Sequence, residues 1–171
     1  MKILTIQDKK EKEFLKKKTR LFDFSKFSRK EIGDLVKNMK EIMIAANGVG
    51  LAANQVGLDF NLFVAQSPRV ESSSDYKFYA IFNSEIIKNS EGKNKMDEGC
   101  LSVPGGIYGE VERSSRITIV GFDKNGKKIK IKAWGFLARI FQHEVDHLNG
   151  VLYIDKAKTI QKIESREQNL E

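Results

Sequence analysis

The sequence has very little cysteine and histidine: Cys100, His143 and His147 are the only residues of these types among its 171. A single cysteine excludes a disulfide bond within the chain, as is usual for a protein of a reducing cytosol. No apolar run approaches the roughly 20 residues that a helix needs to span a membrane. The first residues have too short an apolar run for a secretory signal, and their acidic residues argue against a transit peptide. We therefore expect a cytoplasmic protein without membrane contact.

Proline is also rare, and no proline- and glycine-rich linker, internal repeat or low-complexity block divides the chain. We expect one domain over residues 1–171, with a polar C-terminal tail from about residue 157. The formal net charge is +7. A basic cluster near the N-terminus could favour RNA, but such a cluster is more often a solvated helix face. Its members are Lys9, Lys10, Lys12, Lys16, Lys17, Lys18 and Arg20.

Hydrophobic periodicity predicts two helices and several short strands. An amphipathic helix should begin at a capping box of Ser28 and Glu31 and end near Asn47. A second helix, from Trp134 to Leu148, is apolar over most of its circumference and should therefore be buried. Strands are expected at residues 61–66, 77–87, 116–122 and 127–133, with a hairpin turn at 123–126.

The remaining segments complete an α+β prediction. We expect surface loops at residues 72–75 and 89–97, and a polar C-terminal helix from about Lys158 to Gln168. Hairpins rather than βαβ units connect the strands, so the sheets should be antiparallel. The predicted fold is antiparallel β-sheets around a central buried helix that carries both histidines, with an N-terminal amphipathic helix and a C-terminal helix.

The two histidines stand four residues apart, in the sequence QHEVDH. Positions i and i+4 share one face of a helix, so His143 and His147 could hold one metal ion, with Glu144 near a water on that ion. The alternative is a helix end with two solvated histidines. Since this helix is predicted to be buried, we favour the metal site.

A third ligand is needed, because a catalytic metal usually has three protein ligands and an open position. Cys100, in DEGCLSVPGG, is the best candidate, although a lone cytosolic cysteine is most often a small buried hydrophobe. Thiolate with imidazole suits Zn²⁺ or Fe²⁺ rather than Mg²⁺ or Ca²⁺.

The stretch NGVGLAANQVG, residues 47–57, has too many glycines for a core helix. It could be no more than a tight connection. Alternatively, Gly50 permits close approach of the backbone, and the Gln55 amide could donate a hydrogen bond to an oxyanion.

Together, GVGLAANQ at 48–55, EGCLS at 98–102 and QHEVDH at 142–147 resemble the three ordered signatures of the peptide deformylases. The resemblance covers about residues 28–155. The first 25 or so residues depart from the family pattern, in which a proline and an arginine commonly follow the first strand.

The resemblance implies removal of the formyl group from N-formyl-methionyl nascent peptides, with release of formate. It also implies one divalent metal ion on Cys100, His143 and His147, with Fe²⁺ as the physiological ion and Zn²⁺, Ni²⁺ or Co²⁺ as substitutes. Glu144 would accept and return a proton, while the Gln55 amide and the Leu101 backbone N–H stabilise the oxyanion.

We expect the substrate to contact residues beside these groups. Phe136 and Ile140 precede His143 on the same helix face and could form an apolar wall for methionine, although they could equally be plain core. The family comparison implies that the peptide adds a strand to the glycine loop, next to Val49 and Gly50. Glu98 and Gly99 lie beside the site.

Two acidic side chains near the metal ligands, Glu98 and Asp146, should hold the ligands in place or stabilise the structure rather than take part in catalysis. Arg113 is the nearest match to the arginine that pairs with this glutamate in the family.

Two other functions remain open at this stage. A zinc endopeptidase would use the same His-Glu-x-x-His helix, but it normally lacks a cysteine ligand. A basic ribosome- or RNA-binding protein with a structural metal would normally have four ligands. A ribosome contact through the basic surface or the C-terminal helix is compatible with the enzyme, whereas sequence-specific nucleic-acid binding is not expected.

Overall fold

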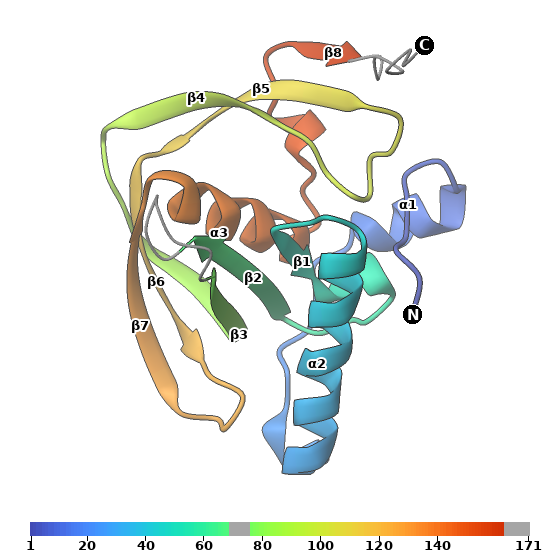
Figure 1. The fold of residues 1–171 in the computed structure, drawn as a ribbon, viewed down its shortest axis with the longest axis vertical. Helices are drawn as coiled ribbons and strands as arrows, with labels where there is room; N and C mark the ends of the chain where they lie inside the picture. Colours follow the sequence, from blue (N-terminus) through green and yellow to red (C-terminus); the bar gives the residue numbers. More distant parts are fainter. Residues whose placement is uncertain (69–75, 163–171) are drawn as a thin grey trace, which may run out of the picture.

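The computed structural model describes residues 1–68 and 76–162, which have the α+β architecture predicted from the sequence (Figure 1). Short 3₁₀ turns lie at Phe24–Lys26, Ala53–Val56 and Tyr153–Asp155. The helices are α1 (Lys9–Leu15), α2 (Arg29–Ala45) and α3 (Gly135–Leu148). The strands are β1 (Gly50–Ala52), β2 (Leu62–Pro68), β3 (Tyr76–Asn89), β4 (Lys93–Glu98), β5 (Ile107–Ser114), β6 (Arg116–Phe122), β7 (Lys128–Trp134) and β8 (Ile160–Lys162).

All the strand pairs are antiparallel within the described residues. A five-stranded sheet has the order β1-β2-β3-β6-β7, and a three-stranded sheet has the order β4-β5-β8. Figure 1 shows α3 between the two sheets, with β4, β5 and β8 above it. This arrangement leaves β1 and β7 at the two edges of the larger sheet.

The helix expected from Ser28 onwards is α2. The capping box is formed, because the Glu31 backbone N–H donates to Ser28 Oγ at 3.2 Å and the Ser28 N–H donates to the Glu31 carboxylate at 2.7 Å. Its apolar stripe is buried against the sheet, beside Leu51, Leu62, Val64 and Phe82. The buried residues of this stripe are Ile32, Val36, Met39 and Met43.

The strands β6 and β7 form the hairpin predicted by the Asn-Gly signal. Their register pairs Phe122 with Lys128 and Arg116 with Trp134. Along β7 the lysines are exposed while the alternate residues Ile129, Ile131 and Ala133 turn inwards. This period of two is the one that the sequence KKIKIKA predicts.

The helix α3 begins at Gly135, with Trp134 as its N-cap, and ends at Leu148. Phe141 is fully buried and makes edge contacts with Phe63 and Tyr79. The helix therefore packs on the five-stranded sheet through its apolar face.

The N-terminal segment packs on the end of α3. Thr19 donates to the Leu148 carbonyl through both its backbone N–H (2.9 Å) and its hydroxyl (3.0 Å). Gly150 has φ +73°, and a Cβ there would overlap the backbone of Lys16. The segment that departs from the family pattern therefore needs a glycine two residues after the end of α3.

Two predicted elements were wrong. Residues 93–97 of the expected loop belong to β4 (Lys93–Glu98), whose KNKMDE sequence has no apolar alternation because five of its six residues are exposed. Residues 160–162 of the expected C-terminal helix form β8, which pairs with β5. The rest of that helix, residues 163–168, and the loop at 72–75 lie outside the described residues. No described helix is long and apolar enough to cross a membrane.

Candidate active site

The structure brings Cys100, His143 and His147 together. Their ligand atoms all lie within 4.8 Å of one another. The histidines come from consecutive turns of α3, and Cys100 follows β4 in a turn closed by a bridge to Val103. Cys100 Sγ is 3.1 Å from His147 Nε2. The group therefore offers one sulfur and two imidazole nitrogens to a single point.

The electrostatics of this group favour a thiolate. Burial opposes ionisation of Cys100, but the neighbouring His147 and His143 hold the pKa of its thiol well below the usual value. Burial also acts against the charged form of His143, yet Cys100 and Glu98 raise the pKa of His143 to about 10. A cation bound at this point would take over the role of the imidazole proton, so its binding should release protons.

Glu144 lies beside the group and is 3% exposed. Its Oε2 has no hydrogen-bond partner among the described residues, and burial raises the pKa of its carboxyl group to about 7. An unpaired buried carboxylate costs stability, and groups with such perturbed pKa values are frequent in catalytic sites.

The space for this carboxylate depends on Gly50. A Cβ at Gly50 would overlap Glu144 Oε1 and lie 2.7 Å from its Cδ. The close approach that the sequence suggested at Gly50 is thus, in this structure, an approach of the Glu144 side chain.

We expect Gly50→Ala to lower kcat by about 10²-fold, because a shift of roughly 1 Å in a reacting group can cost that much. Steady-state kinetics would measure it. Gly33→Ala is the matched control, since a Cβ at Gly33 meets nothing within 4 Å. Equal kcat values for the two variants would contradict the expectation.

Gln55 is held with its amide nitrogen towards the cysteine. Its Oε1 accepts from the Ala52 N–H at 2.9 Å, while Nε2 donates to Ser102 Oγ at 3.1 Å and approaches Cys100 Sγ at 3.5 Å. The neighbouring Asn54 donates to the His147 carbonyl at 2.6 Å. The 3₁₀ turn after β1 therefore supports both the amide donor and the end of α3.

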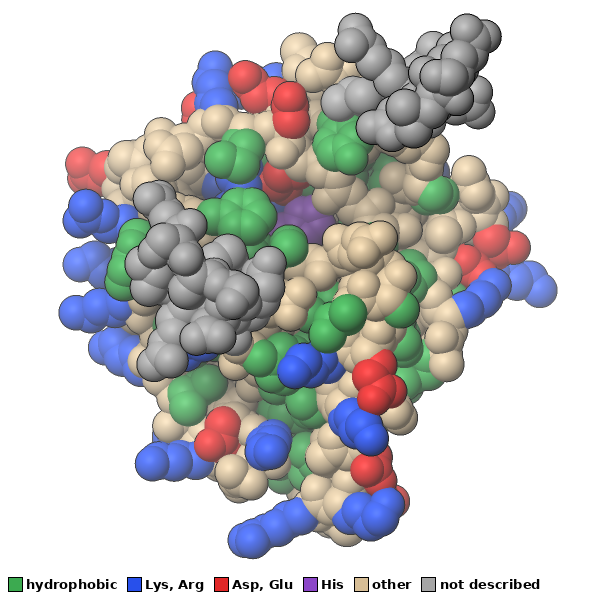
Figure 2. Space-filling model, viewed as in Figure 1, with side chains coloured by type: hydrophobic (Ala, Val, Ile, Leu, Met, Phe, Trp, Pro, Cys, Tyr) green, Lys and Arg blue, Asp and Glu red, His purple; other side chains and the backbone are tan. Residues whose placement is uncertain are grey.

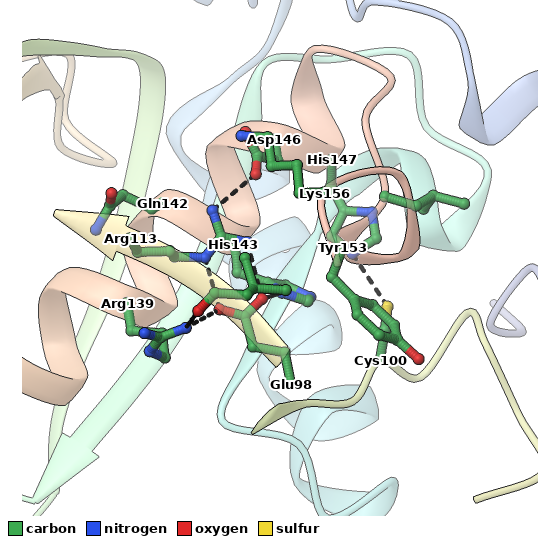
Figure 3. Close-up of polar contacts among 12 residues, drawn as sticks. Glu98, Cys100, Arg113, Arg139, Gln142, His143, Asp146, His147, Tyr153 and Lys156 are labelled. Carbon is green, nitrogen blue, oxygen red and sulfur yellow. Dashed lines mark hydrogen bonds and ion pairs between the residues drawn. The ribbon is translucent and has the colours of Figure 1, made fainter. Parts of the chain in front are cut away.

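Glu98 lies at the centre of a buried ionic network (Figure 3). Its carboxylate accepts from Arg113 at 2.6 and 2.8 Å and from Arg139 at 2.5 Å. Its Oε2 is also 2.9 Å from His143 Nδ1. Burial opposes its ionisation, but Arg113 and His143 keep the pKa of Glu98 far below its usual value. This contact fixes the ring of His143, so that Nε2 points to the other ligand atoms.

The pairing of Glu98 with Arg113 was predicted, but Arg139 was not. Arg139 also donates to the Val111 carbonyl (3.1 Å) and the Asn94 carbonyl (2.7 Å), so it ties α3 to β4 and β5. The available signal was a single arginine inside the otherwise apolar run FLARIF. A charge at such a position needs a buried partner.

We expect Arg139→Met to lower the free energy of unfolding by about 3 kcal/mol, because it leaves part of a buried carboxylate uncompensated. Chemical denaturation would measure the change. Lys156→Met is the control, since the exposed Lys156–Asp146 pair should contribute less than about 1 kcal/mol. Similar losses in both variants would contradict this role for Arg139.

These groups open into a pocket of about 600 Å³. Figure 2 shows histidine at the bottom of a hollow that is bordered by hydrophobic side chains. Among the predicted ligands, proton carrier, oxyanion donors and substrate contacts, only His147 is absent from its lining. The others that line it are Val49, Gly50, Gln55, Glu98, Gly99, Cys100, Leu101, Phe136, Ile140, His143 and Glu144.

The sequence model of the family described as Polypeptide deformylase matches residues 1–163, further than the motifs alone indicated. A peptide deformylase of Halothermothrix orenii is 49% identical over 126 residues, which are 74% of this chain and 77% of that protein. One from Thermodesulfovibrio yellowstonii is 44% identical over 133 residues, covering 77% of this chain and 78% of the other.

Solved structures give the same result. A probable peptide deformylase from Synechococcus phage S-SSM7 has a TM-score of 0.79 and 38% identity, covering 91% of this chain and 99% of the other. A class I type b peptide deformylase from Acinetobacter baumannii with bound Met-Ala-Ser has a TM-score of 0.80 and 29% identity, covering 91% and 97%.

Proposed function

The chain belongs to the polypeptide deformylase family, and we propose that its removal of the formyl group from N-formyl-methionyl peptides takes place on Cys100, His143 and His147 with Glu144 as the proton carrier. The single observation that carries this proposal is the convergence of those three ligand atoms beside a buried, unpaired carboxylate.

The donor set fits one divalent ion. A thiolate and two imidazoles suit Fe²⁺, and we propose Fe²⁺ as the physiological ion. We propose Zn²⁺, Ni²⁺ or Co²⁺ as ions that can replace it. A divalent ion bound there acts as a Lewis acid that polarises the formyl carbonyl and acidifies water. Glu98 holds His143 in the orientation that this requires, and we propose a supporting role for it rather than contact with the substrate.

Glu144 is not needed as a ligand and is free to move a proton. We propose that its carboxylate accepts a proton from the attacking water and later gives it to the departing amine nitrogen, which balances the hydrolysis. Its raised pKa supports this, because a group that titrates near neutral pH can both accept and donate.

Oxyanion stabilisation is assigned to two donors. The Gln55 amide nitrogen faces Cys100 from the buried turn after β1, and we propose that one of its N–H groups turns to the developing oxyanion. We propose the backbone N–H of Leu101, next to the ligand cysteine, as the second donor.

Substrate contacts follow from the pocket. Phe136 and Ile140 on α3, with Val49 beside β1, provide apolar wall for the methionine side chain. Because β1 is an edge strand, Gly50 and its neighbours can pair with an extended peptide. The relative with bound Met-Ala-Ser supports a peptide of this kind as the ligand. Gly99 lines the same pocket.

We further propose that the chain is a single catalytic domain that acts in the cytoplasm on nascent chains and contacts the ribosome through its basic surface.

Formate release from a formyl-Met dipeptide, assayed anaerobically with Fe²⁺ and again with Zn²⁺, tests the activity. A zinc endopeptidase would instead cut an internal peptide bond, and such cleavage without formate release would refute the proposal.

The pH dependence follows from Glu144. Since its deprotonated form accepts the proton, kcat/KM should rise with pH across one ionisation. Burial raises the pKa of Glu144 from 4.5 to about 7, and a bound cation draws it down again. The midpoint of the rise in kcat/KM is therefore expected between pH 4.5 and about pH 7. Values of kcat/KM for the Zn²⁺ form, measured over this pH range at constant metal content, would test the expectation. A kcat/KM that does not change with pH over this range would contradict it.

A further inference from the structure

A second surface, outside the pocket, is formed by the open face of β6 and β7. The inward residues of β7 pack with the cluster around α3. Its alternate residues Lys128, Lys130, Lys132 and Trp134 must therefore project from the opposite face of the sheet. The helix α2 covers this opposite face over β1 and β2. Figure 2 shows a column of basic side chains along its left margin, where Figure 1 places β7.

Strand register extends this face beyond β7. Arg116 on β6 is directly opposite Trp134, and Lys88 on β3 and Lys132 on β7 are both paired with Thr118. Directly paired residues project from the same side of a sheet. The hairpin turn adds two further lysines at one end. We call the whole set the β7 face: Lys88, Arg116, Lys124, Lys127, Lys128, Lys130, Lys132 and Trp134.

The β7 face carries a large excess of positive charge: Glu85 on β3, which pairs with Val120 as Lys130 does, is the one acidic side chain that the strand register places on it. None of its seven basic side chains forms an ion pair with another described residue. The basic cluster at α1 is different, because it is interleaved with Glu11 and Glu13 and its Lys16 pairs with Asp155. An excess of charge of one sign concentrates ligands of the opposite sign.

Protection of a sheet edge explains only part of this pattern. Lysines on an edge strand discourage pairing with other chains, and β7 is such a strand. Lys88 and Arg116, however, lie on the interior strands β3 and β6. The charge thus covers an area of sheet rather than a line along its edge.

Trp134 supplies an aromatic surface at the end of the row of lysines. It is 71% exposed and is the one exposed large apolar side chain of β6 and β7. Two residues further on, Phe136 lines the pocket. Trp134 is thus close along the chain to a residue of the pocket lining, although it projects from the face of the sheet opposite α3.

We propose that the β7 face binds single-stranded RNA without sequence specificity, with phosphates on the lysine row and a base stacked on Trp134. A cationic surface that follows the backbone, combined with an exposed aromatic ring, is the usual design of such sites. An anionic membrane would be bound by a broad apolar face, and one tryptophan does not provide it. The proposal is independent of the reaction in the pocket.

The test uses metal-loaded protein and a fluorescein-labelled RNA of about 12 nucleotides, within the usual site size. One triple variant carries Lys128→Gln, Lys130→Gln and Lys132→Gln. The matched control carries Lys9→Gln, Lys10→Gln and Lys12→Gln, which remove the same charge from α1. Fluorescence anisotropy over a salt series gives the affinity and its salt dependence.

We expect the β7 variant to lose about tenfold in affinity and the slope of log K against log salt to shrink by about 2, since each single-strand phosphate contact contributes about 0.7. The α1 variant should change little. Both should keep the formate-release rate on a short peptide. Equal loss in the two variants, or a parallel loss of rate in the β7 variant, would overturn the proposal.

Trp134 is the sole tryptophan, so intrinsic fluorescence reports on this face directly. RNA should quench it, and Trp134→Ala should weaken binding about tenfold, whereas Trp134→Phe should largely retain it. Heparin, a polyanion without bases, serves as the second probe. Equal quenching by heparin, or tighter binding to vesicles of anionic lipid than to RNA, would overturn base stacking as the mode of recognition.

Discussion

Replacement of Glu144 by glutamine is expected to lower kcat by about 10²- to 10⁴-fold, the usual contribution of a positioned acid–base group. Glutamine has nearly the same shape, so Gly50 still accommodates it. It cannot accept a proton from water at neutral pH. Because Glu144 is not among the three converging ligands, the metal content per chain should not change.

Steady-state kinetics with metal analysis of the same samples would check this result. Glu110→Gln is the control, since Glu110 lies on β5 outside the pocket lining and pairs only loosely with Lys95. Near-normal turnover in Glu144→Gln would show that another group carries the proton. Loss of metal from this variant would instead make Glu144 a ligand.

Cys100→Ser should remove most of the bound metal and, with it, the activity. A serine hydroxyl is not ionised at neutral pH, whereas the histidines hold the pKa of the Cys100 thiol well below its usual value. Soft thiolate is also the ligand that distinguishes this site from one suited to Mg²⁺ or Ca²⁺. The expected loss exceeds the 10- to 100-fold that removal of a supporting group such as Glu98 would cause.

Competition with a chromophoric chelator would measure the affinity. Alkylation gives an independent measurement, because Cys100 is the sole cysteine and any modification reports on it alone. Metal-loaded native protein should resist iodoacetamide and react after metal removal. Ser102→Ala is the matched control, since its hydroxyl contacts Gln55 but is not among the ligands. Rapid alkylation of the metal-loaded protein would show that the sulfur does not bind the ion.

The sequence alone was sufficient for elements whose signals are local. The capping box at Ser28, the Asn-Gly turn before β7 and the apolar period of α3 each depend on neighbours within a few residues. The spacing of His143 and His147 in QHEVDH also predicted that these two side chains share one face of a helix, because that is a matter of local geometry.

Elements without a local signal could not be predicted. The sequence of β4 is typical of a polar loop and that of β8 was assigned to a helix, because both strands are exposed and form only by pairing with β5. A strand of this kind is determined by its partner rather than by its own propensity.

Within the site, the tertiary structure decided which groups meet across the fold. Neither the ionic network of Arg139 with Glu98 nor the fit of Glu144 against Gly50 can be derived from spacing along one helix. Each joins residues more than 40 positions apart. Burial then sets their energetics, because it makes the charge of Glu98 depend on Arg113 and His143 and raises the pKa of Glu144 to about 7. The kind of chemistry could therefore be predicted from residue types and their local spacing. The shifts in pKa depend on desolvation, which only the packed fold produces.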